Sequence, residues 1–67
     1  MTIRLNGQPR EIAESATLQA LLRELGLAGR RGVAIAVNDT VAPRSTWETH
    51  PLVPADRVLV IQATQGG

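Results

Sequence analysis

One leucine stripe constrains the fold of this chain more than any other feature of its sequence. The stripe has the i, i+3, i+4 and i+7 spacing of a single helix face and consists of Leu18, Leu21, Leu22 and Leu25. We predict a helix over residues 17–25, with Thr17 as its N-cap, Ser15 as a competing cap, and Gly26 as the left-handed residue that ends it. Because one helix cannot bury its own stripe, the rest of the chain must cover it.

Two strands are predicted before this helix. Residues 2–6 alternate polar and apolar side chains, which is the pattern of a half-buried strand. Asn6-Gly7 suits a type I′ turn, in which both central residues have positive φ, so residues 8–12 can return as the second strand. Pro9 has no N–H to donate, which favours a place at the sheet edge.

The chain after the helix is predicted to be more irregular. Residues 33–37 place large apolar side chains on one strand face and alanines on the other, and Asn38-Asp39 signals a turn. Residues 41–54 contain three prolines and little periodicity, so we expect an irregular segment with a short helical turn that packs Trp47 on the core. Residues 54–56 indicate another turn before the final strand.

The 67 residues therefore predict one α+β domain, in which one face of a sheet packs on the single helix. A chain this short buries only about 60% of the surface that it exposes when unfolded, so its core is thin. Cysteine is absent and histidine occurs once, at His50, which leaves neither disulfides nor a metal cluster to reinforce that core. The core must hold through packing or through a partner.

Charge and missing chemistry argue against several classes of function. The formal net charge is only +1 and Trp47 is the one aromatic residue, whereas nucleic-acid binding favours a basic stripe with aromatic residues for stacking. No cysteine nucleophile, metal-ligand spacing or phosphate-binding glycine loop is present, and we interpret the loop residue His50 as a surface or packing residue. Neither a membrane-spanning run nor a signal peptide is apparent, so we expect a soluble, cytoplasmic protein that is monomeric alone.

The chain ends in Gly66-Gly67, which allows two interpretations. Chain termini are commonly disordered, and two glycines can simply be a frayed end. Two residues without Cβ atoms also make a thin, pliable backbone that can enter a narrow cleft and bring the carboxylate of Gly67 close to a reagent. The dipeptide alone does not decide between these interpretations.

The last predicted strand, residues 57–64, favours the functional interpretation. It carries apolar side chains on both faces, although the single helix can cover only one of them. On the other face, Leu59 and Ile61 are predicted to lie beside Ala34 or Ala36 of residues 33–37. Such an exposed apolar patch is typical of protein interfaces, and at the root of a Gly-Gly tail it would present that tail to a partner enzyme.

Four segments together resemble one known family: residues 18–25, 37–47, 56–60 and 66–67. The family is ThiS, the sulfur carrier proteins of thiamine biosynthesis, which are β-grasp relatives of ubiquitin. The likeness covers essentially the whole chain, and the spacing of Asn38, Pro43-Arg44 and Trp47 is its most discriminating part. The chain departs from the family at Ala55, where glycine often precedes the aspartate, and at Thr64-Gln65, where small or apolar residues are also seen.

The resemblance implies a β-grasp (ubiquitin-like) fold, a mixed sheet of four to five strands packed on one main helix. It implies a single domain over residues 1–67, with residues 65–67 as a flexible C-terminal tail. It also implies a protein co-substrate, not an enzyme. In the family, a ubiquitin-activating-type adenylyltransferase uses ATP and magnesium to adenylate the terminal glycine, here Gly67, and a sulfur donor protein then leaves a thiocarboxylate. The thiocarboxylate delivers sulfur to thiazole synthase, and the carrier itself binds no cofactor.

Three alternatives stay open at this point. The small subunit of molybdopterin synthase also ends in Gly-Gly and uses the same chemistry for a different client. A ubiquitin-like modifier would instead join its carboxylate to lysines of target proteins; this chain has no lysine, which excludes lysine-linked chains of itself but not single conjugation. An RNA-binding β-grasp module would bind in a salt-dependent way, and the nearly balanced charge argues against it.

Overall fold

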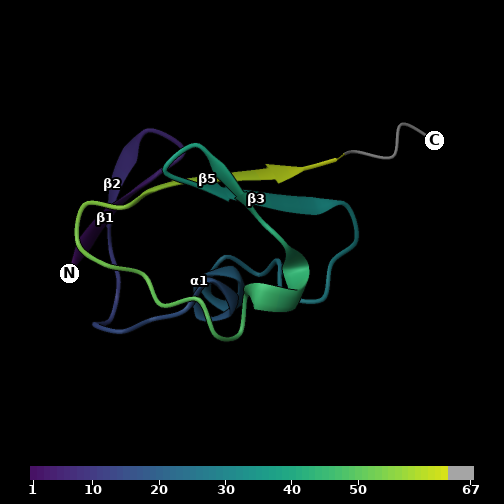
Figure 1. Ribbon diagram of the computed structural model, residues 1–67, viewed down its shortest axis with the longest axis horizontal. Helices are drawn as coiled ribbons and strands as arrows, with labels where there is room; N and C mark the ends of the chain where they lie inside the picture. Colours follow the sequence, from purple (N-terminus) through teal and green to yellow (C-terminus); the bar gives the residue numbers. More distant parts are fainter. Residues whose placement is uncertain (64–67) are drawn as a thin grey trace.

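The computed structural model describes residues 1–63, so the predicted tail at residues 65–67, with Gly66 and Gly67, lies outside the described residues. The described elements are β1 (Thr2–Leu5), β2 (Gln8–Glu11), α1 (Leu18–Glu24), β3 (Val33–Val37), β4 (Thr40–Ala42), the 3-10 turn η1 (Arg44–Thr46) and β5 (Arg57–Gln62). They form one five-stranded sheet in the order β2-β1-β5-β3-β4, with α1 against one of its faces (Figure 1). β1 and β5 run parallel and the other neighbours antiparallel, which confirms the predicted α+β arrangement with a mixed sheet.

Two hairpins with the same kind of turn build the outer parts of the sheet. Asn6 and Gly7 have φ of 50° and 82°, so the predicted type I′ geometry between β1 and β2 is confirmed. Asn38 and Asp39, with φ of 50° and 71°, connect β3 directly to β4 in the same way. The expectation of an irregular segment from residue 41 onward is therefore wrong at its start. Three residues are too few for an alternating pattern to identify β4, and its pairing with β3 forms it instead.

The helix begins and ends where its capping residues predict. The Thr17 hydroxyl accepts a hydrogen bond from the Ala20 N–H at 3.2 Å, so Thr17 is the N-cap. Gly26 has φ of 75°, and the N–H groups of Gly26 and Leu27 donate to the carbonyls of Arg23 and Leu22, which is a Schellman ending. α1 has seven residues, and no helix within residues 1–63 is long and apolar enough to cross a membrane.

The core lies between α1 and the inner face of the sheet. Leu18, Leu21 and Leu22 are fully buried and Leu25 is half-buried, as the stripe predicts. The strands contribute the inner-facing side chains of Ile3, Val33, Ile35, Val37 and Val58. A helix of seven residues is not stable alone in water, so this packing holds it in place.

The segment after β4 closes the remaining side of the core. Trp47 is buried next to η1, and its indole N–H donates to the Ala42 carbonyl at 2.8 Å, which confirms its predicted packing role. The guanidinium of Arg44 lies 5.0 Å from the centroid of the Trp47 ring and donates to the Arg30 carbonyl. Arg44 therefore connects this segment to the loop after α1.

A buried carboxylate joins the predicted turn at residues 54–56 to the β3–β4 turn. Asp56 accepts hydrogen bonds from the Asn38 side-chain amide at 3.0 Å and from the Val53 N–H at 2.9 Å. The Asn38 side-chain oxygen in turn accepts from the Arg57 N–H at 2.9 Å. Ala55 takes a left-handed conformation with φ of 70°, which explains why a glycine would suit this position. Asn38, one of the most discriminating residues of the resemblance, therefore has a structural role.

Candidate functional site

The two faces of β5 differ sharply in exposure. Val58 points to the helix side and is 2% exposed, whereas Leu59 and Ile61 point to the other side and are 47% and 54% exposed. Successive side chains of a strand point to opposite faces, so one strand serves both the core and the surface. The described strand ends at Gln62, and the Ala63 N–H still donates to the Gly32 carbonyl at 2.7 Å. The predicted last residue of this strand, residue 64, lies outside the described residues.

The apolar residues of this outer face form a continuous patch. Ala36 lies directly between Leu59 of β5 and Val41 of β4, and Ala34 lies opposite Ile61. We call this set the outer patch: Ala34, Ala36, Val41, Leu59 and Ile61. The predicted neighbourhood of Leu59 and Ile61 with the two alanines of β3 is confirmed, and its role in binding stays a prediction.

Val41 is the one member of the outer patch that the sequence pattern did not predict. Val41 is 72% exposed, the most exposed of the large apolar side chains among residues 1–63. The sequence pattern places Val41 in the irregular segment 41–54, directly after the predicted Asn38-Asp39 turn. A two-residue turn after β3 followed by Thr40-Val41-Ala42 is a hairpin signal, and it would have placed Val41 beside Ala36.

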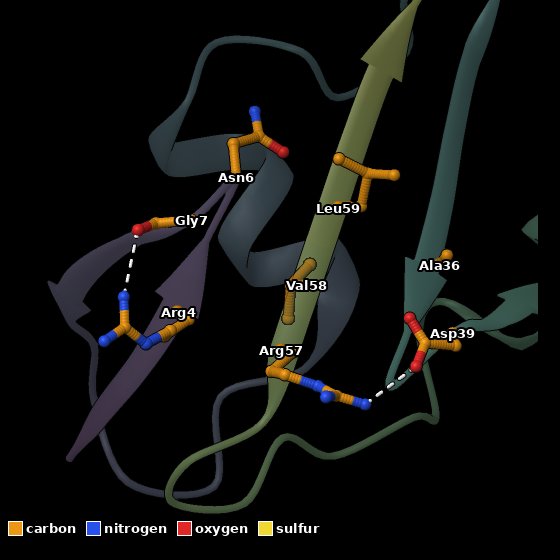
Figure 2. A pocket seen from close by; sticks show the side chains of 8 residues that line it. All are labelled: Arg4, Asn6, Gly7, Ala36, Asp39, Arg57, Val58 and Leu59. Carbon is orange, nitrogen blue, oxygen red and sulfur yellow. Dashed lines mark hydrogen bonds and ion pairs between the residues drawn. The ribbon is translucent and has the colours of Figure 1, made fainter.

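A hollow borders the outer patch on the side of the two hairpin turns. Figure 2 shows it from the outer side of the sheet, with α1 behind. The Arg57 guanidinium is paired with Asp39 at 2.9 Å, and Arg4 donates to the Gly7 carbonyl at 3.0 Å. The residues that line the hollow are Arg4, Asn6, Gly7, Ala36, Asp39, Arg57, Val58 and Leu59. An apolar centre with a charged and polar rim is the usual anatomy of a protein interface.

Groups that could perform chemistry by themselves do not gather in the described part of the chain. Among residues 1–63, no three His, Cys, Asp or Glu side chains come together as they would around a metal ion. His50 is half-buried, and its carbonyl accepts the Leu18 N–H at 3.1 Å, where it supports the start of α1. The arrangement is suited to docking another protein. The two predicted reactive residues, Gly66 and Gly67, lie outside the described residues.

Comparison with known proteins gives a consistent result over the whole chain. The model of the ThiS family matches residues 3–67. The chain is 33% identical to the sulfur carrier protein ThiS of Escherichia coli, and the match covers the full length of both proteins. It is also 31% identical to a thiazole synthase of Paramagnetospirillum magneticum, of which it spans only 20%.

The fold agrees with a solved structure as well. The crystal structure of the thiamine biosynthesis protein ThiS from Geobacter metallireducens superposes with a TM-score of 0.83 at 28% sequence identity. The match covers the whole of both chains. The sheet order and the single helix are therefore those of the β-grasp fold, as the resemblance implies.

Proposed function

The chain belongs to the ThiS family, and from this premise we propose that it carries sulfur for thiazole formation as a thiocarboxylate at Gly67. The observation that carries the proposal is the full-length match to the Escherichia coli carrier. The exposed outer patch beside the strand that leads to Gly66-Gly67 supports it, since a carrier must dock on the enzymes that act on its end.

The chemistry must come from partners, because a free carboxylate is ionised at neutral pH and is a poor electrophile. An adenylating enzyme supplies ATP and magnesium, and a carboxylate oxygen of Gly67 attacks the α-phosphorus with release of pyrophosphate. Sulfide-level sulfur, delivered by a sulfur donor protein or present as HS⁻ in the test below, then attacks the acyl carbon, the bond from that carbon to the AMP oxygen breaks, and loss of the S–H proton leaves the thiocarboxylate. This chain contributes the acyl group and the docking surface, which makes it a co-substrate.

The proposed client is thiazole synthase. A segment similar to this entire chain forms part of a protein named thiazole synthase, which supports a direct working relation between the two. This observation favours the thiamine pathway over the molybdopterin alternative. It also favours sulfur transfer over conjugation to target lysines.

Intact-protein mass spectrometry tests the proposal. The protein is incubated with ATP, magnesium, sulfide and its cognate adenylating enzyme, and we expect a mass gain of one oxygen-to-sulfur exchange that maps to Gly67. A variant that lacks Gly67 should keep the amide NMR spectrum of the folded native chain and gain no mass. Sulfur loading of this variant, or no exchange in the native chain with an enzyme of verified activity, would refute the mechanism. Higher-mass protein adducts in cells would instead indicate a modifier.

A further inference from the structure

β1 ends before its neighbour β5 does. The parallel pairing joins Arg4 to Arg57 and Leu5 to Val58 and goes no further. The Asn6 N–H then donates to the Val58 carbonyl, and the Asn6 side-chain oxygen accepts the Val60 N–H, both at 2.8 Å. On this side of β5, the Asn6 side chain therefore makes the last hydrogen bond, and the rest of the strand has no neighbour here among the described residues, although β3 still pairs with it on the other side.

The remaining part of β5 exposes backbone groups on the side that β1 leaves. Hydrogen bonds of the Arg57 carbonyl with the Asn38 N–H and of the Ala63 N–H with the Gly32 carbonyl show that the odd-numbered residues face β3. The groups of the even-numbered residues point the opposite way. Within residues 1–63, no hydrogen bond satisfies the Val60 carbonyl or the N–H and carbonyl of Gln62. We call these three groups the open edge of β5.

The two outermost strands are protected against strand addition, whereas the open edge is not. β2 contains Pro9, and β4 has only three residues before Pro43. Prolines and short strands are common devices that prevent an edge from pairing with another chain. The open edge belongs to Val60 and Gln62, and neither residue is a proline or carries a charge that would prevent pairing. Gln62 is also exposed. Figure 1 shows the end of β5 extending past β1.

We propose that the open edge of β5 binds an extended segment of the adenylating enzyme by strand addition, with the outer patch as the adjoining side-chain contact. The inference rests on the proposed function and specifies how that partner holds the carrier. An acceptor, a donor and a second acceptor at strand spacing are complementary to another extended backbone. Ile61 lies between the two edge residues and points to the outer patch, so one segment would contact both.

The position of this edge explains why the adenylating enzyme is the occupant. Gly67 lies five positions after Gln62, a stretch of chain that spans at most about 18 Å when fully extended. A strand of the enzyme bound at Gln62 would hold the start of this stretch in place and so limit where the carboxylate of Gly67 can lie. Adenylation needs the carboxylate in line with the α-phosphate of ATP. Holding two reacting groups in the right geometry supplies a large part of an enzyme's rate enhancement.

A matched pair of variants at Gln62 tests the proposal. Gln62→Pro removes the N–H of the open edge and places a ring in the path of an incoming strand, whereas Gln62→Ala keeps the N–H. The Gln62 N–H makes no hydrogen bond within residues 1–63, so neither variant should disturb the fold, which far-UV circular dichroism and thermal unfolding check. Calorimetric titration with the adenylating enzyme should show at least about tenfold weaker binding for Gln62→Pro and a change below about twofold for Gln62→Ala.

Amide hydrogen exchange by NMR gives a direct second measurement. The Gln62 N–H should exchange rapidly in the free protein and at least about tenfold more slowly in the complex. Unchanged exchange at Gln62, or native affinity of a folded Gln62→Pro variant, would overturn strand addition. Sulfur loading of the native chain at saturating enzyme, measured in parallel, shows whether the carrier function itself holds. Protection of Gln62 in a dimer of the free protein would assign the edge to a second copy and also overturn the proposal.

Discussion

The inner and outer faces of the sheet are made by alternate residues of the same strands, yet they serve different purposes. Val58 and Ile35 on the inner face are 2% and 1% exposed, whereas Leu59 and Ile61 on the outer face are about half exposed. Removing atoms from the inner face leaves a cavity, but removing them from the outer face leaves none. In this small domain, one step along a strand therefore separates residues that hold the fold from residues available to a partner.

Truncation of a side chain that packs between α1 and the inner face of the sheet should have the largest effect on stability. Leu21→Ala removes a fully buried side chain of α1 and should lower the free energy of unfolding by about 3 kcal/mol. A core of this size supplies only about 3–5 kcal/mol in total, so much of the variant should unfold at physiological temperature. Urea denaturation followed by circular dichroism measures the change. A loss below about 1 kcal/mol would contradict the assignment of this face as the core.

The buried carboxylate of Asp56 comes next in expected effect. Asp56→Ala leaves the Asn38 amide and the Val53 N–H without their acceptor and should cost about 2 kcal/mol of unfolding free energy. Asp56→Asn retains one acceptor oxygen and should lose less. Equal losses in the two variants, measured by urea denaturation, would show that the hydrogen bonds are not the source of the stability.

Substitution in the outer patch should affect binding more than stability. The double variant Leu59→Gln, Ile61→Gln should weaken binding to the adenylating enzyme at least about tenfold, which corresponds to about 1.4 kcal/mol. Its free energy of unfolding should change by less than about 1 kcal/mol, since both side chains are already half exposed. Calorimetric titration and urea denaturation measure the two quantities.

Val53→Gln is the control for the outer patch, because Val53 is 53% exposed but lies outside the patch. Its affinity for the enzyme should be that of the native chain. Native affinity of the folded double variant would exclude the outer patch as the docking surface. Weakened binding of the control would place the interface elsewhere.

The smallest expected effect is a gain in stability at Ala55. Ala55→Gly relieves a left-handed conformation that a Cβ atom disfavours, and it should raise the free energy of unfolding by about 0.5 kcal/mol. For a domain of this size, the gain corresponds to a rise in Tm of about 2–4 °C. Binding to the enzyme should stay unchanged, because Ala55 is not part of the outer patch and its N–H donates to the Thr2 carbonyl at the start of β1. A decrease in Tm would contradict the strain at this position.

The sequence alone determined the features that arise within a few residues of one another. The leucine stripe, the Thr17 and Gly26 caps and the Asn6-Gly7 turn were predictable because helix periodicity, capping and positive φ are local properties. Alternation in residues 33–37 and 57–62 likewise predicted two faces and the exposure of Leu59 and Ile61.

Only the tertiary structure decided which strands are neighbours and which residues therefore meet. Pairing of β1 with β5 joins residues more than fifty positions apart and leaves the open edge, and no local pattern encodes where β1 stops along β5. Val41 entered the outer patch only because β4 pairs with β3 through a turn. Strand pairing depends on burial across the whole sheet, so three residues with weak intrinsic preference become a strand when their neighbours provide the surface.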